Sequence, residues 1–231
     1  MAIPVKVATP ETSETFGGVT YNITGELVPV LNIELSHMPI YFEHHVLLWK
    51  QTTVDIGIKN LQGAFKRVIA GLPLFITEAK GPGSLGFSRD STGHILSIHL
   101  RHGERIDVRE HQFLAATDSL KYDFKFTKGA VNVLFGGTGF FIDSFTCTQD
   151  QGILWLHGYG NVFEVQLNAG EQIDIEPGGW IYKDPSVKME TMFQKLSTGF
   201  LAGAGQLFWN RFTGPGKVGI QSMSYYYSSA E

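Results

Sequence analysis

The sequence predicts a mainly β fold, either a β-sandwich or an arrangement like a double-stranded β-helix, with one or two short helices. Three observations indicate this: short apolar–polar alternations, glycine-rich turns between them, and an internal repeat of about 67 residues. The chain has 231 residues, of which 43% are hydrophobic, enough for a substantial core. Only 17% are charged, and 27 glycines and 17 phenylalanines favour turn-rich β-structure.

Alternating segments supply the predicted strands. Apolar residues recur at every second position in 122–126, 163–167 and 173–175, the period of a strand with one buried face. The continuous apolar run Ile153–Leu156 is typical of a strand that is buried on both sides. Glycine-rich clusters mark turns at Gly81–Gly83, Gly136–Gly139, Pro177–Gly179 and Gly214–Gly216.

Two segments have the spacing of helices. Residues 60–71 place apolar side chains at positions i, i+4 and i+7, between a capping Asn60 and a terminal Gly71. Residues 189–202 repeat apolar side chains every four positions and are followed by Gly203. We therefore expect a short helix in each segment.

The internal repeat organises the chain. The segment Leu100–Val108, with the pattern Leu-x-x-Gly-Glu-x-Ile-Asp-Val, recurs 67 residues later as Leu167–Ile175. Gly103 and Gly170 supply a tight turn between two strands, and the acid after each is expected to stay in solvent. We predict one β domain over residues 1–231, built from three pseudo-repeats at about 25–85, 86–152 and 153–225.

The charge of the chain bears on its partners. The net charge is −4 and the pI is about 6.1. A general nucleic-acid binder needs a cationic surface, so we expect no nucleic acid as a partner. The low charge content favours an apolar surface that is buried in a homo-oligomer, with Tyr225–Tyr227 as a candidate contact. Peripheral contact with a membrane stays open.

Export and membrane insertion are not predicted. Residues 1–20 lack a basic region followed by an apolar run, and the longest uncharged windows, 129–142 and 196–210, have 14 and 15 residues. A membrane-spanning helix needs about 20 apolar residues. Cys147, the one cysteine, cannot form an intrachain disulfide. We therefore expect a cytoplasmic protein.

Histidines raise the question of a metal site. His99, His102 and His111 lie close in the sequence to Glu104 and Glu110, and imidazole and carboxylate are common metal ligands. No His-x-His motif and no cupin spacing accompanies them, and solvated histidines at strand ends account for the same residues. Metal binding by these histidines therefore stays open, and no metal ligand is assigned.

Motifs of catalysis are missing from the sequence. There is no Gly-x-Ser-x-Gly and no His-Glu-x-x-His, and Gly136–Gly139 is followed by a strand-like segment where a phosphate loop needs a helix. Cys147 also lies in a strand-like context. We assign no catalytic residue and no cofactor site, and we expect no enzymatic activity.

Several motifs together resemble one known family. They are Leu134–Phe141, Leu167 with Gly170-Glu171, and Gly214–Val218, and residues 61–75 fit a further stretch. This set is similar to the altered-inheritance-of-mitochondria family numbered twenty-four, over about residues 25–225. Thr138 and Leu72 stand where the family often has acids.

The resemblance implies a β-sandwich like that of the tryptophan RNA-binding attenuation protein. It also implies a link to inner-membrane organisation in fungal mitochondria, and no established enzymatic activity. We therefore predict a non-enzymatic β scaffold that self-associates, with a role in membrane-associated organisation left open. A cupin-like protein that binds a metal or a small molecule is one alternative. RNA binding is another, through a basic stripe of Arg101, Arg105, Arg109, Lys121, Lys125 and Lys128.

Overall fold

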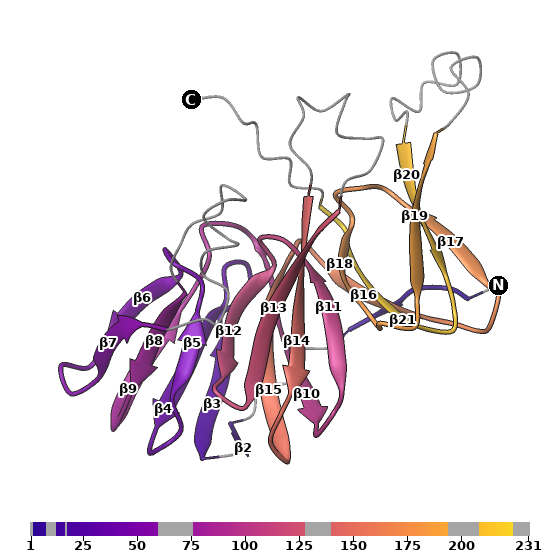
Figure 1. The fold of residues 1–231 in the computed structure, drawn as a ribbon. Coiled ribbons are helices and arrows are strands. Elements are labelled where there is room, and N and C mark those ends of the chain that lie inside the picture. Colours follow the sequence, from indigo (N-terminus) through magenta and orange to yellow (C-terminus); the bar gives the residue numbers. More distant parts are fainter. Residues whose placement is uncertain are drawn as a thin grey trace.

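The computed structural model describes residues 2–7, 13–16, 18–59, 76–127, 140–193 and 208–223. Within these ranges the chain forms 21 β-strands and no helix, so the prediction of a mainly β fold is confirmed. The strands make four sheets, and every strand pair in them is antiparallel (Figure 1). No helix in the described ranges is long and apolar enough to cross a membrane.

The four sheets are named here by their number of strands. The five-stranded sheet has the order β2 (Glu14–Phe16), β3 (Val19–Thr24), β4 (Val30–Leu35), β9 (Gly83–Phe87) and β6 (Leu47–Lys50). The six-stranded sheet has the order β10 (Gly93–Arg101), β15 (Gln151–Tyr159), β12 (Phe113–Thr117), β5 (Ile40–Phe42), β8 (Thr77–Lys80) and β7 (Asp55–Ile58). The seven-stranded sheet has the order β1 (Val5–Lys6), β16 (Val162–Leu167), β21 (Gly216–Gln221), β18 (Trp180–Lys183), β11 (Arg105–Arg109), β14 (Phe140–Cys147) and β13 (Leu120–Thr127). The three-stranded sheet has the order β17 (Gln172–Ile175), β20 (Phe208–Thr213) and β19 (Lys188–Phe193).

Three apolar cores separate these sheets. The first lies between the five-stranded and six-stranded sheets, where Phe87 and Trp155 are buried. The second lies between the six-stranded and seven-stranded sheets, and the third between the seven-stranded and three-stranded sheets, around Trp180 and Phe212. Each inner sheet therefore buries both of its faces, which suits the low charge content of the chain.

The predicted strands are confirmed. Residues 122–126, 163–167 and 173–175 lie in β13, β16 and β17, and the apolar run Ile153–Leu156 lies in β15. In β15, Ile153 and Trp155 face the first core while Leu154 and Leu156 face the second. This alternation explains why the run is apolar at every position.

The predicted helix over residues 189–202 is wrong in the part that the structure describes, residues 189–193. Residues 189–193 belong to β19, which pairs with β20 from Lys188 opposite Thr213 to Phe193 opposite Phe208. Pairing along the whole length of β19 stabilises the strand, whereas a short isolated helix with weak helical spacing is only marginally stable, so the strand forms. Residues 194–202 and the other predicted helix, 60–71, lie outside the described residues.

The two Leu-x-x-Gly-Glu turns are confirmed, and their acids have a structural role. Gly103 and Gly170 have φ values of 81° and 77°, a conformation that glycine adopts without steric cost. The carboxylate of Glu104 accepts a hydrogen bond of 2.8 Å from the backbone N–H of Arg101. The carboxylate of Glu171 accepts the matching bond, 3.1 Å long, from the residue three positions before it. Each acid thus closes its own turn.

Candidate functional site

The histidines considered for a metal site lie apart. On β10, Nε2 of His99 lies 3.3 Å from Oε1 of Glu14 and 3.2 Å from the hydroxyl of Tyr21. His102 is exposed in the turn before β11, whereas His111 follows the end of β11. Five strand residues span about 17 Å, which separates these two histidines by more than one ion can bridge. Among the described residues, no three His, Cys, Asp or Glu side chains are placed to hold a metal ion.

His111 instead belongs to a half-buried ionic cluster between two turns. Nη2 of Arg89 donates to Oε2 of Glu43 and, over 2.6 Å, to the carbonyl oxygen of Phe113. Nδ1 of His111 lies 3.8 Å from Oε1 of Glu43, and its Nε2 lies 3.4 Å from Oε1 of Glu110. The cluster therefore connects the turn after β5 with the turn between β11 and β12.

The charges of this cluster compensate one another. Burial alone would lower the pKa of His111, but its interactions with Glu110 and Glu43 outweigh burial and raise the pKa to about 9. Burial would raise the pKa of Glu43, but His111 and Arg89 hold it below its usual value. At neutral pH two cations thus face two anions. Such a cluster links the two turns through opposite charges.

Behind the cluster lies a buried histidine, His157, whose backbone N–H donates to the carbonyl oxygen of Gln112 over 2.8 Å. His157 in β15 is 1% exposed, and within the described residues neither ring nitrogen makes a hydrogen bond of full geometry, although a backbone contact with Ser91 acts to raise its pKa. Burial, with the nearby charge of Arg89, lowers the pKa of His157 to about 3, so the ring is neutral at physiological pH. The amide of Gln112 is also buried and unpaired within these residues. The sequence analysis missed these residues, although the apolar run that continues into His157 was a usable signal.

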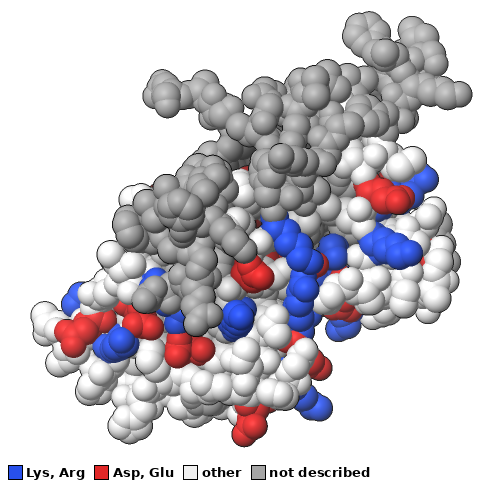
Figure 2. All heavy atoms as spheres, in the orientation of Figure 1, with Lys and Arg blue, Asp and Glu red and all other residues white. Residues whose placement is uncertain are grey.

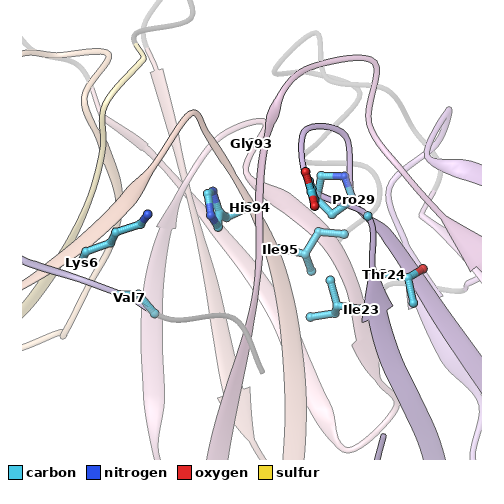
Figure 3. A pocket seen from close by; sticks show the side chains of 10 residues that line it. Lys6, Val7, Ile23, Thr24, Pro29, Gly93, His94 and Ile95 are labelled. Carbon is cyan, nitrogen blue, oxygen red and sulfur yellow. The ribbon is translucent and has the colours of Figure 1, made fainter. Parts of the chain in front are cut away.

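A cleft of about 900 Å³ opens between β1, the start of β10 and the β3–β4 turn. In Figure 3, Lys6 extends toward His94 on one wall, and Ile23 and Ile95 line the interior. Nδ1 of His94 donates to the carbonyl oxygen of Gly160 over 2.7 Å, which fixes the ring. The mixed lining of this cleft does not converge on a ligand of particular chemistry.

The predicted basic stripe is interrupted where it is described. Lys121 and Lys125 are exposed on one face of β13, but Asp123 lies between them on that face. Arg105 is engaged with Asp107 through a hydrogen bond of 2.6 Å. Figure 2 shows Lys and Arg side chains interspersed with Asp and Glu over this part of the molecule. Lys128 lies outside the described residues.

The two ends of the stack of sheets carry edge strands. β6 and β7 are edges of the five-stranded and six-stranded sheets and lie at one end of the molecule, whereas β17 lies at the other end (Figure 1). Four apolar side chains are exposed at the first end: Leu48 by 60%, Trp49 by 41%, Ile56 by 40% and Ile58 by 65%. Exposed apolar side chains beside an open strand edge are typical of an interaction surface.

These features define an all-β protein of stacked antiparallel sheets with no assembled catalytic centre in its described residues. The chain belongs to the mitochondrial biogenesis AIM24 family, whose model matches residues 21–223. This is the family that the sequence motifs predicted. The fold is similar to the crystal structure of protein SPYM3_0169 from Streptococcus pyogenes, with a TM-score of 0.71 and 20% sequence identity over 89% of this chain and 94% of that chain. No curated protein matches the sequence.

Proposed function

We propose that this protein is a non-enzymatic scaffold that acts by associating with copies of itself. The observation that carries the proposal is the exposed apolar end formed by β6 and β7. A monomeric protein rarely exposes neighbouring large apolar side chains next to unpaired strand edges, since both promote association. The compensated charges around His111 support a structural role for this half-buried cluster.

We infer that the scaffold is built from three units, and the order of the strands supports this division, with unit 3 beginning at Val162 and not at the predicted residue 153. Unit 1 comprises β4–β9, unit 2 comprises β10–β15, and unit 3 comprises β16–β21. In each unit the first, sixth and third strands form one triplet, with the orders β4-β9-β6, β10-β15-β12 and β16-β21-β18. The second, fifth and fourth strands form another, with the orders β5-β8-β7, β11-β14-β13 and β17-β20-β19. The same strand order in each unit supports a common origin of the three.

The mass of the protein in solution tests this function. Native mass spectrometry and sedimentation velocity from about 1 to 100 µM are expected to show a complex at an integer multiple of 25.6 kDa. A strictly monomeric protein over this range would reject the scaffold. Additional bound mass from a metal ion or small molecule would favour the cupin-like alternative instead.

A further inference from the structure

The three units are joined to one another by one recurring strand pair. β12, the third strand of unit 2, pairs with β5, the second strand of unit 1. β18, the third strand of unit 3, pairs in the same way with β11, the second strand of unit 2. Each joint therefore fuses a triplet from one unit with a triplet from the preceding unit into one continuous sheet.

Each joint pairs the third strand of one unit with the second strand of the preceding unit. The third strand of unit 1 and the second strand of unit 3 are therefore the two strands not used in a joint, and each is called an unused half. β6 is the third strand of unit 1, and it is the last strand of the five-stranded sheet. β17 is the second strand of unit 3, and it is the first strand of the three-stranded sheet. Among the described residues neither strand has a partner on its outer side. Because β6 and β17 lie at opposite ends of the molecule, they cannot pair within one chain (Figure 1).

The joint between units 2 and 3 contains a buried ion pair. Lys183 on β18 lies opposite Asp107 on β11, and its Nζ is 3.1 Å from Oδ2 of that aspartate. Both residues are 6% exposed. The same Nζ donates to two backbone carbonyl oxygens, those of Asp184 at 3.3 Å and Val187 at 2.9 Å. These bonds hold the ammonium group in place to meet the carboxylate.

The unused half on β6 carries the same lysine arrangement. Nζ of Lys50 donates to the carbonyl oxygens of Gln51 at 3.3 Å and Val54 at 2.9 Å, the same positions along the strand and turn as in β18. The preceding residue matches as well. The indole of Trp49 lies over Gly86 on β9, as the ring of Tyr182 lies over its glycine on β21. β6 therefore reproduces the surface with which β18 joins β11, except that within the described ranges its lysine faces no carboxylate across the strand.

The unused half on β17 carries the matching aspartate. Asp174 occupies the place in the Leu-x-x-Gly-Glu-x-Ile-Asp motif that Asp107 occupies in unit 2. Its carboxylate accepts two hydrogen bonds of 2.7 Å from Arg211, and each oxygen retains a lone pair for another donor. The remaining strand residues Gln172 and Ile173 are at least partly exposed. The two ends of the chain are thus complementary in charge and in strand pattern.

We propose that β6 of one copy pairs antiparallel with β17 of a second copy, with Lys50 opposite Asp174 and Trp49 opposite Ile175. This inference rests on the proposed self-association and names its interface. The pairing joins the five-stranded and three-stranded sheets of two copies into one sheet of eight strands. It also covers Trp49 and Leu48, whose counterparts in β18 are buried. Because the contact is head to tail, it produces a ring when the rotation between copies closes and a filament when it does not.

Charge reversal in two variants tests the pairing. Lys50→Asp places two acids at the joint, and Asp174→Lys places two bases there, so each variant alone is expected to associate about tenfold more weakly or worse. Mixing the two variants in equal amounts restores an opposite-charge pair wherever the two variants alternate. A filament or a ring with an even number of copies can alternate throughout, whereas a ring with an odd number retains one like-charge joint. We expect the mixture to reassociate in sedimentation velocity, and to recover the parent's size when the parent is a filament or has an even number of copies. Circular dichroism melts of each variant check that the subunit itself is folded.

Disulfide cross-linking tests the register. With Cys147 replaced by alanine, Lys50→Cys combined with Asp174→Cys is expected to give a ladder of linked chains under oxidation, and Lys50→Cys with Gln172→Cys much less. If the parent assembles but both charge variants assemble equally well, or if their mixture stays dissociated, the β6–β17 pairing is wrong and self-association stands. If the parent is a monomer at about 100 µM, the proposed function fails together with the interface.

Discussion

Replacing His157 with leucine is expected to flatten the pH dependence of stability between pH 7 and pH 5. Leucine has nearly the volume of histidine and adds no polar atom, so the core around β15 can retain its packing. The change removes a buried imidazole whose ring nitrogens make no hydrogen bond of full geometry among the described residues. The variant therefore isolates the effect of one titrating group.

The expected magnitude follows from the two protonation states of His157. In the unfolded chain the imidazole binds its proton near its ordinary pKa of 6.5, whereas in the folded protein its pKa is lowered to about 3. Below pH 6.5 the unfolded state thus binds more protons, and the free energy of unfolding falls by about 1.4 kcal/mol per pH unit. Between pH 7 and pH 5 this amounts to about 2 kcal/mol, since titration of the unfolded state begins only near pH 6.5.

Urea denaturation of the parent and the variant at pH 7, 6 and 5 measures this difference. His111, whose pKa is raised to about 9, contributes with the opposite sign, but it is present in both proteins and cancels. A variant at the exposed His102, His102→Leu, serves as the control and is expected to follow the parent. If His157→Leu loses stability in parallel with the parent, the ring is hydrated or hydrogen-bonded in solution, and the reasoning from burial is refuted.

Two further predictions concern packing and charge. Lys183→Met, which leaves a buried carboxylate without its lysine, is expected to cost about 3 kcal/mol in urea denaturation, whereas Lys50→Met costs less than about 1 kcal/mol in the dissociated protein. Equal losses would show that burial does not distinguish the two lysines. Gly158→Ala is expected to lower the Tm by several degrees, since its Cβ would lie 2.4 and 2.7 Å from two apolar side chains and overpacking costs about 1–3 kcal/mol. Gly57→Ala, with nothing within 4 Å of its Cβ, is expected to leave the Tm nearly unchanged, and a similar loss in both would contradict the steric explanation.

Local sequence patterns were sufficient to predict much of the fold. The alternation in 163–167 and the apolar run Ile153–Leu156 identify strands because one-sided and two-sided burial leave different marks on a sequence. The same approach failed at residues 189–193, where apolar spacing fitted a helix and pairing with β20 decided the structure. The spacing of apolar residues and the composition indicate the conformation that one segment prefers by itself. They do not indicate which strand will pair with it.

The candidate interface could be read only in part from the sequence. The motif around Asp174 was visible as a repeat of that around Asp107, but its meaning depends on which strand lies across from it. Lys183 and Lys50 share no conspicuous motif, and their equivalence emerges from matching hydrogen bonds to the backbone. Contacts between residues far apart in the chain are set by topology, and topology had to be observed.

The two-sided burial of β15 has a consequence for how the protein unfolds. Its odd-numbered side chains Ile153 and Trp155 anchor one core, and Leu154 and Leu156 anchor the next. Pulling this strand away would open both of these cores at once, so neither the first nor the second core can melt while the other survives. Deleting a unit is therefore expected to disrupt the adjoining core as well, and amide protons of β15 are expected to exchange only through global unfolding.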